Sequence, residues 1–189
     1  MKIGILGGTF NPPHLGHLVL AQEALDKYRL EKILFIPTNI PPHKQGDLTP
    51  PKARLEMLKL AIADKPKFEV SDLEIIRPGV SYTIDTIKAL KKQCPNDDFF
   101  LIIGSDLSEN FSTWKNYKEI KNQVEIIVAR RKDYPSHESQ DFIYLDITFI
   151  DLSSSEIRSK IANNCPLSDL VKPEVADYIY KNKLYLNAK

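Results

Sequence analysis

The hydrophobic pattern along the chain alternates between short apolar runs and stretches with a helical period. The apolar runs are short, rich in β-branched or aromatic residues and apolar on both faces, which is typical of buried strands. The sequence therefore predicts strands at residues 3–6, 33–36, 99–103 and 124–129.

Between these runs, apolar residues recur three or four positions apart, which predicts amphipathic helices. The clearest patterns lie within residues 18–28, 55–62 and 84–90. A start signal precedes the second pattern, with Thr49 as the expected N-cap and Pro50 at the first helical position.

Two further helices are expected near the C-terminus, at residues 154–162 and 173–181, packed on the sheet. Alternation of strands and helices predicts an α/β, Rossmann-like, doubly wound fold, in which a mostly parallel sheet carries helices on both faces and a C-terminal helical segment follows. In such sheets ligands bind at the carboxyl ends of the strands. The loops after Leu6, Ile36 and Ile103 are therefore the expected binding region.

Composition is that of an ordinary globular protein, and residues 1–189 are expected to form a single domain. The 26 Lys and Arg against 25 Asp and Glu argue against nucleic acid or an anionic membrane as a partner. No apolar run approaches the ~18 residues of a membrane span, and the two cysteines follow no disulfide or zinc spacing. A cytoplasmic setting is therefore expected, and a homodimer stays open.

Glycine is scarce but concentrated near the N-terminus. Four of the seven glycines lie in the first sixteen residues, namely Gly4, Gly7, Gly8 and Gly16. A glycine-rich turn between a strand and a helix presents backbone N–H groups and a helix dipole to an anion. His14 and His17, three positions apart on the opening helical turn, are expected to face the same side and to donate hydrogen bonds to phosphate oxygens.

Other interpretations of this loop stay open. Turn chemistry alone explains many glycines after a first strand. A metal site at the two histidines is disfavoured because no Asp, Glu or Cys lies nearby to complete it. Gly16, between the histidines, would let a large ligand approach the backbone.

A second candidate site lies at residues 152–158, where Ser153 and Glu156 match the capping box that begins a helix. A capped helix start with extra hydroxyl groups, and with Arg158 one turn in, also suits a phosphate. The structural and the functional interpretation are compatible.

Two motifs carry a family resemblance. Residues 7–17, Gly-Gly-Thr-Phe-Asn-Pro-Pro-His-Leu-Gly-His, resemble the HxGH signature of the nucleotidyltransferase superfamily, and residues 152–158 resemble its ISSxxxR motif. Five more segments, in order, are similar to those of bacterial nicotinate-nucleotide adenylyltransferases: PPHK at 41–44, RxxML at 54–58, SYTxDT at 81–86, IIGxD at 102–106 and WK at 114–115. The resemblance covers essentially the whole chain.

This resemblance implies adenylyl transfer from ATP to nicotinate mononucleotide, giving nicotinate adenine dinucleotide and pyrophosphate in NAD biosynthesis. It implies Mg²⁺ with ATP, bound mainly by the phosphates and therefore without a protein metal site that the sequence would reveal. The expected catalytic residues are His14, His17 and Arg158. The residues expected to bind ATP are Gly7, Gly8, Thr9, Phe10, His14, His17, Gly104, Asp106, Ser153, Ser154 and Arg158. Those expected to bind the mononucleotide are Lys44, Tyr82, Thr83 and Trp114.

Several residues also have a purely structural interpretation. Trp114 has polar neighbours, which suits an exposed indole that stacks on a ring, but a partly buried packing role stays open. Asp106 follows a buried strand and suits a ribose hydroxyl, yet it could equally be an N-cap, as could Ser81 or Thr83. Other functions also stay open: phosphopantetheine adenylyltransferase, a cytidylyltransferase, or a non-catalytic nucleotide sensor on the same fold.

Overall fold

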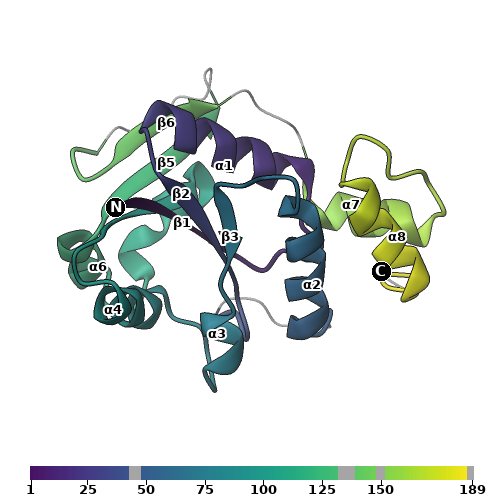
Figure 1. The fold of residues 1–189 in the computed structure, drawn as a ribbon, viewed down its shortest axis with the longest axis horizontal. Coiled ribbons are helices and arrows are strands. Elements are labelled where there is room, and N and C mark those ends of the chain that lie inside the picture. The colour runs from purple at the N-terminus through teal and green to yellow at the C-terminus, as the bar shows by residue number, and fades with distance from the viewer. Residues whose placement is uncertain (43–47, 132–138, 148–151, 187–189) are drawn as a thin grey trace.

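The computed structural model describes residues 1–42, 48–131, 139–147 and 152–186. Within these ranges six strands form one sheet in the order β3-β2-β1-β4-β5-β6 (Figure 1), and every ladder between them is parallel. The strands are β1 (Lys2–Gly8), β2 (Lys32–Pro37), β3 (Phe68–Val70), β4 (Asp98–Gly104), β5 (Glu125–Arg131) and β6 (Ile143–Ile147).

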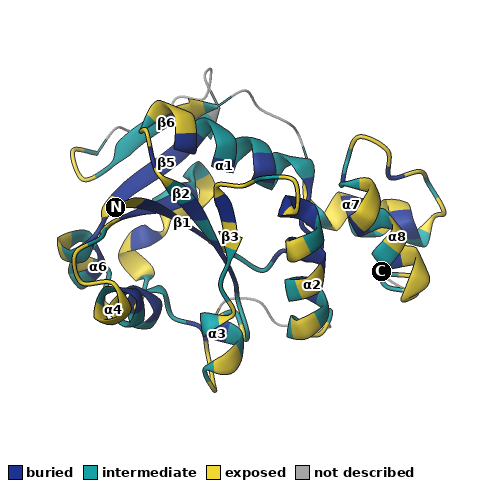
Figure 2. Ribbon diagram, in the orientation of Figure 1, coloured by how far each residue is buried: buried dark blue, intermediate teal, exposed yellow. Residues whose placement is uncertain are grey.

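Helices cover both faces of this sheet, and each face has its own hydrophobic cluster. Leu18 of α1, Leu58 of α2, Ile157 of α7 and Ile179 of α8 belong to one cluster, whereas α4 and α6 contribute to the other (Figure 2). The helices are α1 (Leu15–Lys27), α2 (Pro51–Ile62), α3 (Leu73–Ile76), α4 (Thr83–Gln93), α5 (Ser105–Glu109), α6 (Tyr117–Gln123), α7 (Ser154–Ala162) and α8 (Pro173–Lys181), with a 3-10 helix η1 (Phe111–Thr113). The Rossmann-like, doubly wound prediction is confirmed.

Three of the four predicted strands lie within β1, β2 and β4, and the fourth begins one residue before β5, since Val124 is the C-cap of α6; β3 and β6 were not predicted. Both missed strands are at the edges of the sheet. β3 has only three residues, and in β6 only Leu145 is buried, so neither shows a continuous apolar run. None of the described helices is long and apolar enough to cross a membrane.

The predicted start of α2 was wrong by one residue. Pro50 is the N-cap and keeps an extended ψ of 139°, so the helix begins at Pro51, and Thr49 does not cap it. The reason is steric, because a residue that precedes proline is disfavoured in the helical region, and Pro50 precedes Pro51.

The two C-terminal helices have the predicted bounds but a different packing partner. α8 contacts α2, and the backbone N–H of Leu15, the first residue of α1, donates to the carbonyl of Leu170. Figure 1 shows α7 and α8 beyond α2 rather than over the strands. The expectation that they pack directly on the sheet was therefore wrong, since α1 and α2 already cover that face.

Candidate active site

The sheet opens at the carboxyl ends of β1 and β4. These neighbouring strands pair only as far as Leu6 and Ile102. Beyond that point β1 continues along β2 to Gly8, and β4 continues along β5 to Gly104. Because the strand order reverses here, the opening is the topological switch point at which ligands of doubly wound folds bind.

The two histidines of the first loop lie together at the start of α1. His14 is the N-cap, with an extended backbone, and His17 is the third helical residue. Their ring centroids are 3.7 Å apart, and the backbone N–H of His14 donates to Nδ1 of His17 over 3.2 Å. This confirms that they share one side of the turn. Because Nδ1 accepts, a neutral His17 carries its proton on Nε2, which makes Nε2–H a donor.

His14 is a buried and neutral residue. The residue is 8% exposed, and this desolvation lowers the pKa of the imidazole to about 4, against a smaller opposing effect of the Glu156 carboxylate. Its Nδ1 has no hydrogen-bond partner among the described residues. A Cβ on Gly16 would lie 3.0 Å from this atom, so Gly16 makes room for the His14 ring. Gly16 therefore has a role in packing, and its role in ligand approach stays a prediction.

The second motif begins α7 as the sequence predicts. The side chain of Ser153 accepts from the backbone N–H of Glu156, and a Glu156 carboxylate oxygen accepts from the backbone N–H of Ser153 at 2.9 Å. The capping box is therefore confirmed. It fixes the first turn of α7, from which Ser154 and Arg158 extend.

Ser154 and Arg158 connect the two motifs directly. The Ser154 hydroxyl donates to the Pro12 carbonyl at 2.9 Å, and Nη1 of Arg158 donates to the Asn11 carbonyl at 2.9 Å. Nη2 of Arg158 also donates to the Ser155 hydroxyl. These bonds use two of the five N–H donors of the guanidinium, so donors remain for a phosphate.

Arg54 joins the loop after β1 to both ends of the connection between β2 and α2. It is fully buried, and its guanidinium donates to the carbonyls of Thr9 at 2.7 Å, Asn39 at 3.2 Å and Thr49 at 2.9 Å. Burial lowers the pKa of Arg54 from its usual range. Arg54 lies on the buried side of α2 together with Met57, and a charged residue in such an apolar stripe is the signal from which its buried partners could have been predicted.

The C-terminal segment reaches the same loop through Tyr185. Its hydroxyl donates to Oδ1 of Asn11 at 2.8 Å and shares a hydrogen bond with Thr49. Burial raises the pKa of Tyr185 to about 12, so the phenol stays protonated and remains a donor near neutral pH. This contact joins residues 174 positions apart, and no local pattern indicates it.

The predicted pyridine end lies at the start of α4. Tyr82 is the N-cap and Thr83 the first helical residue, so the alternatives with Ser81 or Thr83 as N-cap are wrong. The Ser81 hydroxyl instead accepts from the backbone N–H of Asn39 at 3.0 Å. The loop after β2 therefore positions this turn.

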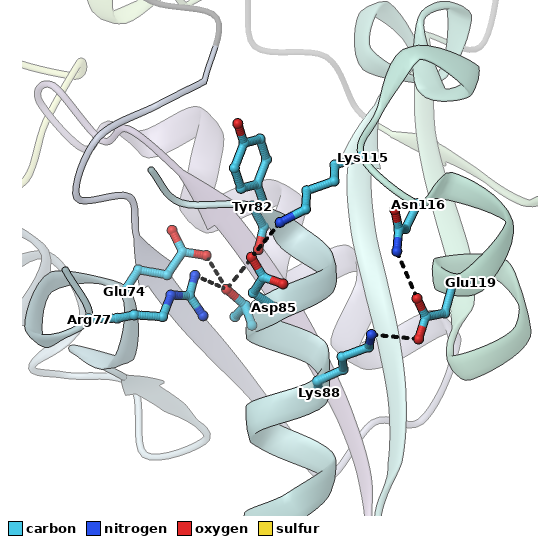
Figure 3. A network of polar contacts seen from close by, with 9 residues as sticks. Glu74, Arg77, Tyr82, Asp85, Lys88, Lys115, Asn116 and Glu119 are labelled. Carbon is cyan, nitrogen blue, oxygen red and sulfur yellow. Dashed lines mark hydrogen bonds and ion pairs between the residues drawn. The ribbon is translucent and has the colours of Figure 1, made fainter. Parts of the chain in front are cut away.

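A buried carboxylate supports the same turn. Glu74 accepts from the Thr86 hydroxyl at 2.7 Å and is hydrogen-bonded to Ser81, and Nη2 of Arg77 donates to the Thr86 hydroxyl (Figure 3). Desolvation raises the pKa of Glu74 above its usual value. No local pattern indicates this role of Glu74, because its partners Ser81 and Thr86 lie 7 and 12 residues further along the chain.

Asp106 and Trp114 both follow β4 in the chain, Asp106 in α5 and Trp114 at the end of η1. Trp114 is half-buried, with its ring 5.2 Å from that of Phe111, which agrees with the packing alternative and leaves its role in binding a prediction. Asp106 is exposed in α5 and is not an N-cap, since Gly104 holds that position. A Cβ on Gly104 would lie 2.5 Å from Oδ1 of Asp106, so this carboxylate lies over the end of β4.

The remaining predicted site residues are Gly7, Gly8, Phe10 and Lys44. Gly7 and Gly8 end β1 at the opening. Phe10 is buried, with its ring 4.9 Å from that of His17, so only its backbone can face a nucleotide. Lys44 lies outside the described residues. Within the described ranges, no three His, Cys, Asp or Glu side chains gather closely enough to hold a metal ion.

Comparison with known proteins identifies the family. Residues 5–160 match the sequence profile of the cytidylyltransferase-like family. The probable nicotinate-nucleotide adenylyltransferase of Borreliella afzelii is 46% identical over 98% of this chain and 97% of its own, and the nicotinate-nucleotide adenylyltransferase of Bacillus subtilis is 40% identical over 97% and 98%. The chain therefore belongs to the nicotinate-nucleotide adenylyltransferases within that family.

A solved structure supports the same architecture. The nicotinic acid mononucleotide adenylyltransferase of Plasmodium falciparum, complexed with NaAD, superposes with a TM-score of 0.83 over 97% of each chain. At 24% identity this likeness concerns the fold.

The buried state of His14 predicts a pH dependence. In the unfolded chain the imidazole titrates near its ordinary pKa, whereas in the folded chain it titrates near 4. The unfolded state therefore binds the proton first, and the free energy of unfolding should fall by up to about 3 kcal/mol between pH 6.5 and pH 4. NMR titration of the ring should show His14 neutral at pH 5, and His14→Gln should remove this part of the pH dependence. A His14 pKa near 6.5 would contradict the prediction.

Arg54 predicts a large effect on stability. Arg54→Lys keeps the charge but has no planar fork to reach three carbonyls, so at least one buried acceptor loses its partner. We expect the free energy of unfolding to fall by about 3 kcal/mol, measured by denaturant titration. Exposed Arg29 offers the matched control, since Arg29→Lys should leave stability unchanged. Equal stability of the two variants is the result that rules out this role.

Proposed function

We propose that the chain transfers the adenylyl group of ATP to nicotinate mononucleotide, forming nicotinate adenine dinucleotide and pyrophosphate in NAD biosynthesis. The observation that carries this function is full-length identity of 40–46% with nicotinate-nucleotide adenylyltransferases. The contact of Ser154 and Arg158 with the first loop supports it, because both superfamily motifs then act on one ligand.

The chemistry requires little from the protein beyond alignment and charge. A phosphate monoester has a second pKa of about 6, so the mononucleotide phosphate is already a nucleophile near neutral pH. It attacks the α-phosphorus of ATP in line, a P–O bond forms, and the bond to the β-phosphate breaks as pyrophosphate leaves with its electron pair. No general base is needed, and catalysis consists of positioning both phosphates and stabilising the charge that develops.

We assign charge stabilisation to the two joined motifs. Nε2–H of His17 and the remaining N–H groups of Arg158 are the proposed donors to the reacting phosphates, together with the backbone amides of residues 7–9. Neutral His14 holds His17 in place through its backbone N–H and offers one ring N–H of its own.

The mononucleotide is proposed to lie across the opening. Asp106, over the end of β4, suits ribose hydroxyl groups, because a carboxylate accepts their hydrogen bonds. Tyr82 and Thr83 are proposed to hold the nicotinate end, with Trp114 against the ring. Lys44 is proposed to reach a substrate phosphate.

Magnesium is expected to accompany ATP. The candidate phosphate donors are imidazole, guanidinium, hydroxyl and amide groups, which bind phosphate oxygens rather than the ion, so they fit a metal held by the nucleotide itself. Bound in that way, Mg²⁺ would neutralise part of the triphosphate charge.

Pyrophosphate release from ATP tests the proposed function. The purified chain should release pyrophosphate with nicotinate mononucleotide and much less with nicotinamide mononucleotide or phosphopantetheine. Faster turnover with phosphopantetheine would favour a sister enzyme of the superfamily. ATP binding without turnover of any acceptor would favour a nucleotide sensor and would overturn the proposed reaction.

His17 should be essential to the rate. His17→Ala removes a positioned donor, and we expect kcat to fall by at least ~10²-fold, while circular dichroism shows an unchanged fold. His17→Gln, which retains an amide donor, should lose less activity. A folded His17→Ala variant with wild-type kcat would refute the assignment.

A further inference from the structure

The ammonium of Lys115 reaches the start of α4 from the segment that follows η1, on a different side chain from Arg77, which donates to Thr86 of the same turn. Nζ of Lys115 lies 4.3 Å from the centre of the Tyr82 ring and 3.2 Å from Oδ2 of Asp85 (Figure 3). Lys115 follows Trp114 directly in sequence. The ammonium therefore bridges two segments that contribute residues to the proposed pyridine end.

Lys115 supplies the counter-charge of Asp85, whereas Glu74 and Arg77 at the same turn both bond to the Thr86 hydroxyl. Asp85 brings a carboxylate into the first turn of α4, three residues after Tyr82. Without a counter-charge, this carboxylate would repel a second carboxylate on an incoming ring. The ammonium has three N–H donors, and its bond to Asp85 uses one of them. The contact with the face of Tyr82 holds the cation in place independently of Asp85.

We propose that Lys115 is a specificity-determining residue, which favours a mononucleotide whose pyridine ring carries a carboxylate over one whose ring carries a neutral amide. This inference rests on the proposed function, because that function places the ring at Tyr82, Thr83 and Trp114. A carboxylate gains charge attraction from the ammonium, whereas an amide gains only a hydrogen bond to its oxygen and brings N–H donors that a cation cannot accept.

The effect should be moderate in size and sensitive to salt. The side chains of Lys115 and Asp85 are 45% and 38% exposed, so solvent screens their charges. Selectivity for the acid should therefore decrease as the NaCl concentration rises.

The experiment compares kcat/KM for nicotinate and nicotinamide mononucleotides at low ionic strength. In Lys115→Met the ratio of the two values should fall about 3- to 10-fold, mainly through a higher KM for the nicotinate substrate. Lys115→Arg should keep the wild-type ratio, because arginine keeps the charge and stacks on Tyr82. Lys115→Gln provides a second neutral variant.

Lys88, which lies on α4 as Asp85 does, supplies a matched control. Its ammonium lies 2.7 Å from a carboxylate oxygen of Glu119, with side-chain exposures of 49% and 37%, and Figure 3 shows this pair further along α4 than Asp85. Lys88→Met should leave the ratio unchanged.

The outcomes separate the inference from the function on which it rests. The role of Lys115 is overturned if the wild type is active and Lys115→Met has the same ratio of the two kcat/KM values. An equal loss of kcat/KM with both mononucleotides also overturns it, because it would mean that Lys115 has a merely structural role. Absence of turnover by the wild type with either mononucleotide overturns the proposed function, and this inference with it.

Discussion

The site depends on one buried guanidinium. Arg54 donates to the carbonyl of Thr9 in the loop after β1 and to those of Asn39 and Thr49 at the two ends of the connection between β2 and α2, and it does so without exposure to solvent. Removing a charge from water costs several kcal/mol, which only good hydrogen bonds offset. The three carbonyls would otherwise be unsatisfied, so cation and loops stabilise one another. The backbone around Thr9 therefore has a single arrangement before any nucleotide arrives, which suits a reaction that needs alignment above all.

Asn11 extends this arrangement to the rest of the chain. Its carbonyl accepts from Arg158, and its side-chain oxygen accepts from Tyr185, so α7 and the C-terminal segment both bind the loop that carries His14 and His17. These segments do not lie on the sheet, yet Ser154, Arg158 and Tyr185 contact the loop that leaves its switch point. A helical addition that lies away from the strands can therefore still influence the geometry of the site, because its side chains bind the loop that carries the two histidines.

Sequence patterns predicted the features that depend on neighbouring residues. Buried strands such as β4 are visible because both faces are apolar, and the Ser153 capping box is visible because its partner is three residues away. Edge strands β3 and β6 were missed because one side has no neighbour to demand apolar residues. Arg54 and Tyr185 were missed for a different reason, because their partners are brought close only by the finished fold.

The two ends of the opening differ in their physics. At the phosphate end, Arg54 and Asn11 are buried whereas His17 and Arg158 are half-buried, and both arginines donate to carbonyls of the loop after β1, so a change there disturbs that loop. At the start of α4, the charges of Lys115 and Asp85 are partly exposed and screened by solvent. A change there alters the binding free energy of the acceptor by a small amount and leaves the backbone in place. A fold of this kind can therefore keep its phosphoryl chemistry while its choice of acceptor changes, because the two are set by residues whose interactions have different strengths.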